Sequence, residues 1–113
     1  MKKIFLIASL TTFLYSSCTF EKSTPLPVGC TTTIFYQTDI KPIIDAKCVS
    51  CHTTGASQGD FTTYGVVKAK VDNGTFKNRV FTLKDMPPGG STQLTEEELS
   101  KLKCWVDQGA PNN

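Results

Sequence analysis

The hydrophobic pattern divides the chain into three parts. Residues 4–14 are mostly apolar, a polar stretch with two prolines and a glycine follows, and apolar side chains later recur at helical spacing. One hydrophobic core is all that a chain of 113 residues is expected to hold. The pattern predicts a leader over 1–17, a tether over 18–34 and a single domain over 35–113.

Two short helices are expected in the first half of the domain. The first covers residues 39–47, and the second covers residues 63–73 and ends at Gly74, which favours a left-handed stop. Each segment places its branched apolar side chains on one face. These apolar positions are Ile40, Ile43 and Ile44 in the first segment, and Val66, Val67 and Val71 in the second.

The last helix has the clearest local signals. Thr95 followed three residues later by Glu98 is the pattern of a capping box, and Gly109 is placed to end the helix. Trp105 is expected to pack in the core or at the edge of a cofactor. The buried stripe is predicted to consist of Leu99, Leu102 and Val106.

The leader has the features of a secretory signal peptide. Lys2 and Lys3 precede the apolar stretch, which is too short for a transmembrane helix. The segment ending at Cys18 resembles a bacterial lipoprotein signal, which implies cleavage before Cys18 and a lipid on its sulfur. Ordinary signal-peptidase cleavage with a spare thiol at Cys18 is the alternative. The resemblance predicts an exported protein, anchored by lipid on the periplasmic side of a bacterial membrane or at the outer membrane.

The charge balance indicates no nucleic-acid partner. Without residues 1–17, ten Lys and Arg face ten Asp and Glu, and the overall formal charge of +2 comes from the leader. Residues 66–84 are locally basic, which we interpret as a solvated face.

The most specific motif is Cys48-Val49-Ser50-Cys51-His52. Cys-x-x-Cys-His is the attachment motif of c-type haem, in which both thiols bind the vinyl groups and the histidine ligates the iron. A thioredoxin-like redox motif is one alternative, but the expected β-α-β pattern is not evident. A zinc site is another, although His52 is the only histidine and no second ligand pair is evident.

A second iron ligand is expected at Met86. It is the only methionine apart from Met1, and prolines and glycines follow it in a non-helical loop. A methionine that merely fills a gap in the core is the alternative interpretation.

Cys30 and Cys104 remain after these assignments. In an oxidising compartment they are candidates for a disulfide that ties the start of the domain to its last helix. The sequence supplies no distance between them, so the pairing stays open.

Taken with these motifs, residues 35–111 resemble a small monohaem cytochrome c of class I type. The resemblance implies an all-α fold of about three to four short helices around one covalent haem c, held by Cys48, Cys51, His52 and Met86. Here the first helix leads directly into the haem motif, so no separate N-terminal helix is expected to pack against the last one. The segments that carry the resemblance are Asp39–Lys47 with the adjoining Cys48–His52, Met86–Pro88 and Trp105–Pro111.

The function implied is one-electron transfer between redox partner proteins, in the periplasm or at a membrane, and not an enzymatic activity. A haem-based sensor, ligand-binding or peroxidase-like module is the alternative if Met86 leaves the distal site open or labile. A thiol redox or metal-binding lipoprotein without haem is a third hypothesis.

Overall fold

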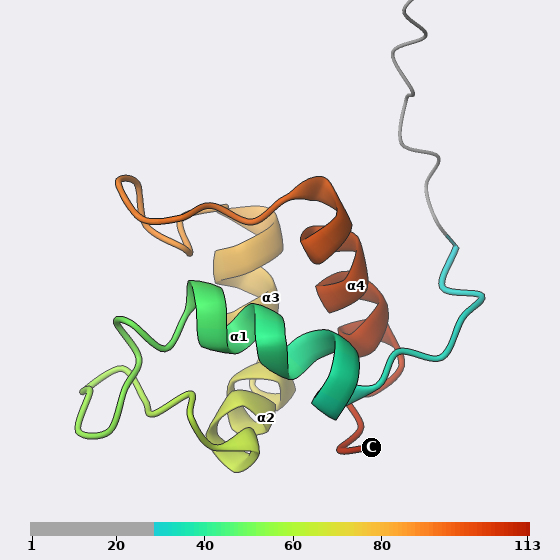
Figure 1. Cartoon of the computed structure of the whole chain (residues 1–113), viewed down its shortest axis with the longest axis horizontal. Helices are drawn as coiled ribbons and strands as arrows, with labels where there is room; N and C mark the ends of the chain where they lie inside the picture. The colour runs from blue at the N-terminus through green and yellow to red at the C-terminus, as the bar shows by residue number, and fades with distance from the viewer. Residues whose placement is uncertain (1–28) are drawn as a thin grey trace, which may run out of the picture.

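The computed structural model describes residues 29–113, and these residues form helices and no strands. Figure 1 shows α1 crossing the middle of the molecule, with α3 above it, α2 below it and α4 at the right. The all-α class predicted from the sequence is therefore confirmed for the described residues. The elements are a π-helical turn Tyr36–Ile40, α1 (Lys41–Lys47), α2 (Tyr64–Asp72), α3 (Thr75–Lys77), a second π-helical turn Asn78–Thr82, and α4 (Glu96–Asp107).

The first helix begins earlier than the apolar pattern predicts, at Tyr36 instead of residue 39. The Asp39 carboxylate accepts a hydrogen bond from the Phe35 amide at 2.9 Å, and the Asn113 side chain accepts one from the Tyr36 amide at 2.8 Å. These contacts satisfy amides that a helix start leaves without partners. Because Asn113 lies far along the chain, local periodicity could not reveal its contribution.

This early start also changes how the helices pack. The π-helical turn contacts α4, and the ring of Tyr36 lies 5.5 Å from that of Trp105 between centroids. Residues 29–35 form no separate helix, yet α4 has a helical partner at the start of the domain. The departure from the family pattern puts the packing of first against last helix in doubt, and here one continuous helix makes both this contact and the approach to Cys48.

The second helix ends where Gly74 takes a positive φ of 79°, as predicted. The chain then forms a further helical stretch, α3 and the π-helical turn after it, which the sequence analysis does not predict. The Asn73 side chain accepts a hydrogen bond from the Thr75 amide at 3.0 Å, which satisfies one of the amides that the start of this stretch leaves without a helical partner. It buries Phe76 and Val80.

The capping box at the start of α4 is confirmed. The Thr95 side chain accepts from the Glu98 amide, and the Glu98 carboxylate accepts from the Thr95 amide. The predicted buried stripe is only partly right, because Leu99 and Val106 are half-buried. The residues of α4 that are buried are Leu102, Cys104 and Trp105.

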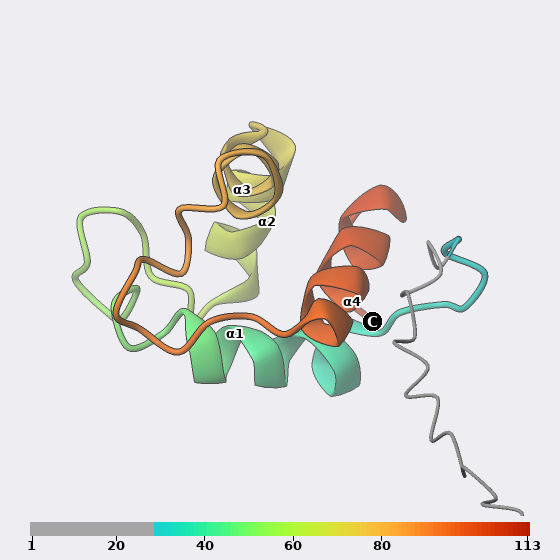
Figure 2. The same ribbon diagram turned by 90° about the horizontal axis from the view of Figure 1, so that it is seen from above.

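The core lies where α1, α2 and α4 meet. Ile40, Ile44, Val67 and Trp105 are fully buried there, so the isoleucine stripe and the packing role of Trp105 are confirmed. Trp105 also donates from its indole nitrogen to the Pro111 carbonyl at 2.9 Å. In the view of Figure 2, α1 lies along the lower edge of the molecule, with α2 and α3 above it at the left and α4 above it at the right.

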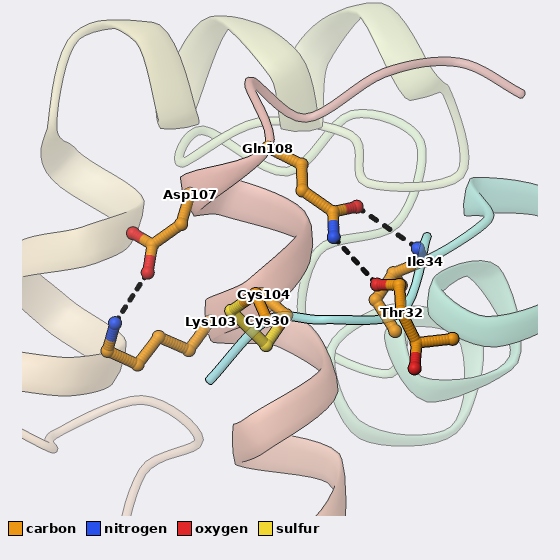
Figure 3. The surroundings of a disulfide bond; sticks show 7 residues. All are labelled: Cys30, Thr32, Ile34, Lys103, Cys104, Asp107 and Gln108. Carbon is orange, nitrogen blue, oxygen red and sulfur yellow. Dashed lines mark hydrogen bonds and ion pairs between the residues drawn. A yellow bond between two sulfur atoms is a disulfide. The ribbon is translucent and has the colours of Figure 1, made fainter. Parts of the chain in front are cut away.

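The segment before the first helix is fastened to α4. Cys30 and Cys104 form a disulfide with a Cα–Cα distance of 5.2 Å, and Gln108 bonds to both Thr32 and Ile34 (Figure 3). Within the tether predicted over 18–34, the stretch from Cys30 onward is therefore held on the domain.

The predicted signal peptide, the lipidation site Cys18 and tether residues 18–28 lie outside the described residues. Within residues 29–113, no helix is long and apolar enough to cross a membrane.

Candidate cofactor site

One pocket brings together the four residues predicted to hold a haem. Cys48, Cys51, His52 and Met86 all line it, although Met86 comes from a loop far from the other three in sequence. The space free of protein atoms, counted out to the open mouth, is about 890 Å³. The cavity itself measures about 190 Å³, which is below the about 300–1,000 Å³ of typical pockets for organic ligands, so the residues that line it and not its size indicate a cofactor site.

The two cysteines follow directly from the end of α1. The Cys51 and His52 amides both donate to the Cys48 carbonyl, at 3.1 and 2.9 Å, so the motif continues as one tight turn. Cys48 is half-buried, Cys51 is exposed, and neither is in a disulfide. This turn presents both thiols and the imidazole to the same pocket.

The environment of Cys48 disfavours a reactive thiolate. Burial, and next the proximity of Cys51, raises the pKa of the Cys48 thiol to about 11. Cysteines that attack disulfides have a lowered pKa instead. A raised pKa is therefore the opposite of what a thioredoxin-like attack by the Cys48 thiol requires.

His52 is oriented by packing and not by a hydrogen bond. Its ring stacks on Phe61 with 4.2 Å between centroids and 15° between planes, and its carbonyl accepts from the Phe61 amide at 2.8 Å. Among residues 29–113, its Nδ1 is the side-chain nitrogen or oxygen that is buried without a hydrogen-bond partner. Such unpaired buried atoms are rare and unfavourable, and they often occur at functional sites.

The loop between His52 and Phe61 is closed by Asp60. Its carboxylate accepts hydrogen bonds from the Thr62 hydroxyl and amide and from the Thr54 hydroxyl. The bonds from Thr62, above all that of its hydroxyl, hold the pKa of Asp60 below its usual value. This turn positions Phe61 against the imidazole.

Met86 is half-buried and packs against the core at the edge of the pocket. The residue before it, Asp85, accepts one hydrogen bond from the Arg79 side chain at 2.7 Å, while its amide donates to the Arg79 carbonyl at 3.1 Å. Pro87, which follows Met86, is buried and also lines the pocket. Met86 is therefore held between two anchored neighbours.

The sequence analysis does not identify the walls of the pocket. They are apolar side chains from four separate segments, and hydrophobic patterns mark such residues only as core positions. The stretch Thr75–Thr82, which it leaves unassigned, supplies two of them. The principal apolar wall residues are Phe61, Phe76, Val80, Leu94 and Leu102.

The donor set of the pocket fits a covalently attached haem. The pocket offers two thiols that are not in disulfides, an imidazole with a buried unpaired nitrogen, a thioether and mostly apolar walls. Haem c uses thiols for attachment, and one imidazole with one thioether is a common axial pair for its iron. In residues 29–113, no three His, Cys, Asp or Glu side chains cluster in a way that could hold a metal ion by themselves.

Comparisons with known proteins identify no relative. No family model matches the chain, and no curated protein or solved structure matches it either. A functional assignment therefore depends on the motif and on the residues that meet in the pocket.

Proposed function

We propose that this protein is a monohaem c-type cytochrome that carries single electrons between partner proteins. Cys48 and Cys51 would hold the haem as thioethers, and His52 and Met86 would be the ligands of its iron. The finer fold assignment follows from this: the helices form a cytochrome c-like domain around one haem. No reaction on a substrate is proposed.

The observation that supports this proposal most is the meeting of Met86 with the Cys-x-x-Cys-His motif. Met86 lies in a different segment, yet it lines the same pocket as Cys48, Cys51 and His52. A methionine that merely fills a gap in the core would have no reason to line the same pocket as the only histidine of the chain. The apolar walls would exclude water from a bound porphyrin.

The haem, when bound, supplies the one-electron change of its iron between the ferric and ferrous states. The chain's own residues fix the surroundings. The stack of Phe61 on His52 limits rotation of the imidazole, and the ion pair of Arg79 with Asp85 holds the backbone next to Met86. A ligand set held in this way rearranges little when the charge on it changes.

We further propose that the protein works outside the cytoplasm, anchored by a lipid on Cys18. Covalent haem attachment and the Cys30–Cys104 disulfide both fit an exported, oxidising location. The redox partners would then be periplasmic or membrane-associated proteins.

Covalent haem is the decisive property to test. The protein is produced in bacteria together with a haem-attachment system, denatured and separated from free haem. We expect haem absorbance to stay with the polypeptide. In the Cys48→Ala, Cys51→Ala variant we expect it to be absent.

The Cys30→Ser, Cys104→Ser variant is the matched control, because it also removes two cysteines but leaves the pocket unchanged. It should keep its haem. A wild-type polypeptide without haem, or with haem that can be extracted, would refute the proposal and would favour a thiol redox or metal-binding function.

A further inference from the structure

We infer that Gln93 and Lys47 are positioning residues that hold the Met86 loop closed over the pocket. The inference depends on the proposed function, since it assigns these two side chains a task toward the distal ligand. The inference goes beyond the proposed function because neither residue is expected to touch the iron. Both act through the backbone of the loop.

The Met86 loop is the segment between Thr82 and Glu96, and the side chain of Gln93 ties distant parts of its backbone together. Its side-chain amide nitrogen donates to three carbonyls of the loop, those of Pro87 at 3.4 Å, Pro88 at 3.0 Å and Ser91 at 3.1 Å. Pro87 directly follows Met86, so this one amide fixes the backbone beside the proposed ligand. A two-proline, two-glycine sequence offers few backbone donors for this purpose, since proline has none.

Lys47 fastens the loop to the haem motif. Its ammonium group donates to the Gln93 carbonyl at 2.9 Å and lies 3.5 Å from the Glu98 carboxylate. Lys47 is the last residue of α1 and immediately precedes Cys48. The side chain of Lys47 is only 11% exposed and that of Glu98 24%, so solvent screens this contact less than it screens a surface ion pair.

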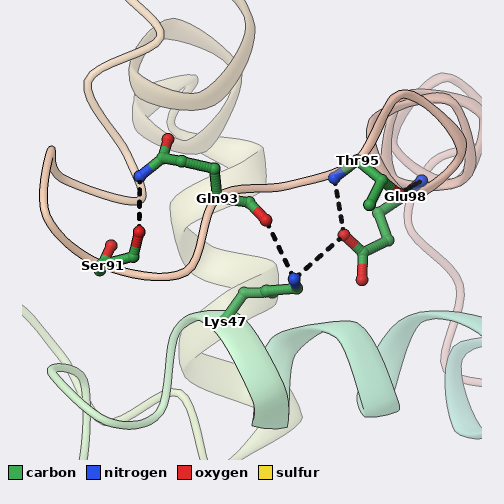
Figure 4. Close-up of polar contacts among 5 residues, drawn as sticks. All are labelled: Lys47, Ser91, Gln93, Thr95 and Glu98. Atoms are coloured by element: carbon green, nitrogen blue, oxygen red, sulfur yellow. Dashed lines mark hydrogen bonds and ion pairs between the residues drawn. The ribbon is translucent and has the colours of Figure 1, made fainter.

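Figure 4 shows how these contacts join three elements. Lys47 rises from α1 toward the loop, and the same Glu98 oxygen that it approaches also accepts from the Thr95 amide at 2.8 Å in the capping box. The start of α4, the end of α1 and the loop therefore meet at one ammonium group. The cysteine side and the methionine side of the pocket are held at a fixed separation by this network.

The test uses holo-protein carrying the Gln93→Leu substitution, which keeps a side chain of similar size, removes the donor and adds no second thioether beside Met86. Loss of these hydrogen bonds should raise the fraction of open loop by roughly tenfold. We expect a weaker methionine-to-iron charge-transfer band, loss of this band at a lower pH than in wild type, and binding of carbon monoxide. Lys47→Leu should act in the same direction.

Matched controls separate positioning from general stability. Gln108→Leu removes a glutamine that also bridges two segments, but it does so beside the disulfide and away from the pocket. Lys101→Leu removes a lysine that pairs with Glu97 on the exposed face of α4. Both control variants should keep the band and remain unreactive toward carbon monoxide.

Covalent haem content is measured first in every protein, so that the two proposals can fail separately. Wild-type protein without haem refutes the proposed function and the inference with it. If wild type carries haem and Gln93→Leu and Lys47→Leu keep the full band, the inference alone is overturned. It is also overturned if the control variants weaken the band as much as the pocket variants do.

Discussion

At the scale of single residues, the ring of Phe61 orients the imidazole of His52 by packing against it and without a hydrogen bond. Phe61 is 8% exposed and stacks on the imidazole of His52. Because Nδ1 of that imidazole has no hydrogen-bond partner, ring packing is what holds the orientation. An apolar wall therefore does the work that a hydrogen bond to a carbonyl or carboxylate commonly does for a ligating histidine.

Replacing Phe61 should accordingly lower the stability of the protein and free the ring of His52 to rotate. We expect Phe61→Ala to lower the free energy of unfolding by roughly 3 kcal/mol, because a buried aromatic ring is lost and a cavity remains. Phe35→Ala is the matched control, since Phe35 is 48% exposed and its loss should change stability by no more than about 0.5 kcal/mol. Urea unfolding of the holo-proteins compares them, and equal losses for the two variants would contradict the role assigned to Phe61.

At the scale of elements, the local sequence predicts α4 well. Its N-terminus is encoded by residues next to one another, Thr95 and Glu98, and the structure forms the predicted capping box. Acidic residues fill the first turn, where they interact favourably with the helix dipole. Signals of this kind depend on few residues and on no distant partner.

Thr95 should therefore contribute measurably to stability. We expect Thr95→Ala to cost about 1 kcal/mol of unfolding free energy, because the Glu98 amide loses its acceptor at the helix start. Thr92→Ala, a substitution of an exposed threonine in the same loop, should cost much less. Denaturant titration followed by circular dichroism makes the comparison, and similar costs for both would argue against the cap.

Other elements could not be predicted from local patterns. The helical stretch Thr75–Thr82 contains β-branched and aromatic residues with low helix propensity, and it is stabilised by burying Phe76 and Val80. The early start of the first helix depends on Asn113. In both cases the deciding contact comes from tertiary structure.

The candidate site likewise combines residues that the sequence predicts with residues that it does not. The spacing of Cys48, Cys51 and His52 identifies the motif, and scarcity singles out Met86. No short sequence pattern predicts the apolar residues that line the pocket, or the contacts by which Gln93 and Lys47 hold the Met86 loop. These residues come from separate segments that meet only in the folded chain.

At the scale of the whole molecule, the first helix links the two ends of the fold. Its beginning packs on α4 through Tyr36, and its end delivers the cysteines and His52 to the pocket. The Cys30–Cys104 disulfide fastens the segment before this helix to α4 as well, closing a span of 74 residues. The pocket thus lies inside a covalently closed loop.

Removing this disulfide should destabilise the fold without emptying the pocket. Closure of a loop of this length is worth about 4 kcal/mol in the chain-entropy description. We expect the Cys30→Ser, Cys104→Ser variant to lose up to this amount in urea unfolding while keeping its haem spectrum. Peptide mapping of unreduced wild type should recover the two cysteines in one linked fragment, and separate fragments would contradict the pairing.

The electron-carrier function is tested most directly by the visible spectrum of the mature protein, made alongside a haem-attachment system. It is recorded oxidised, then reduced, then exposed to carbon monoxide. We predict a methionine-to-iron charge-transfer band when oxidised, a c-type spectrum when reduced and no response to carbon monoxide. A high-spin spectrum that responds to carbon monoxide would take Met86 off the iron and favour a sensor or a peroxidase-like module, and a spectrum without haem would contradict the proposed function altogether.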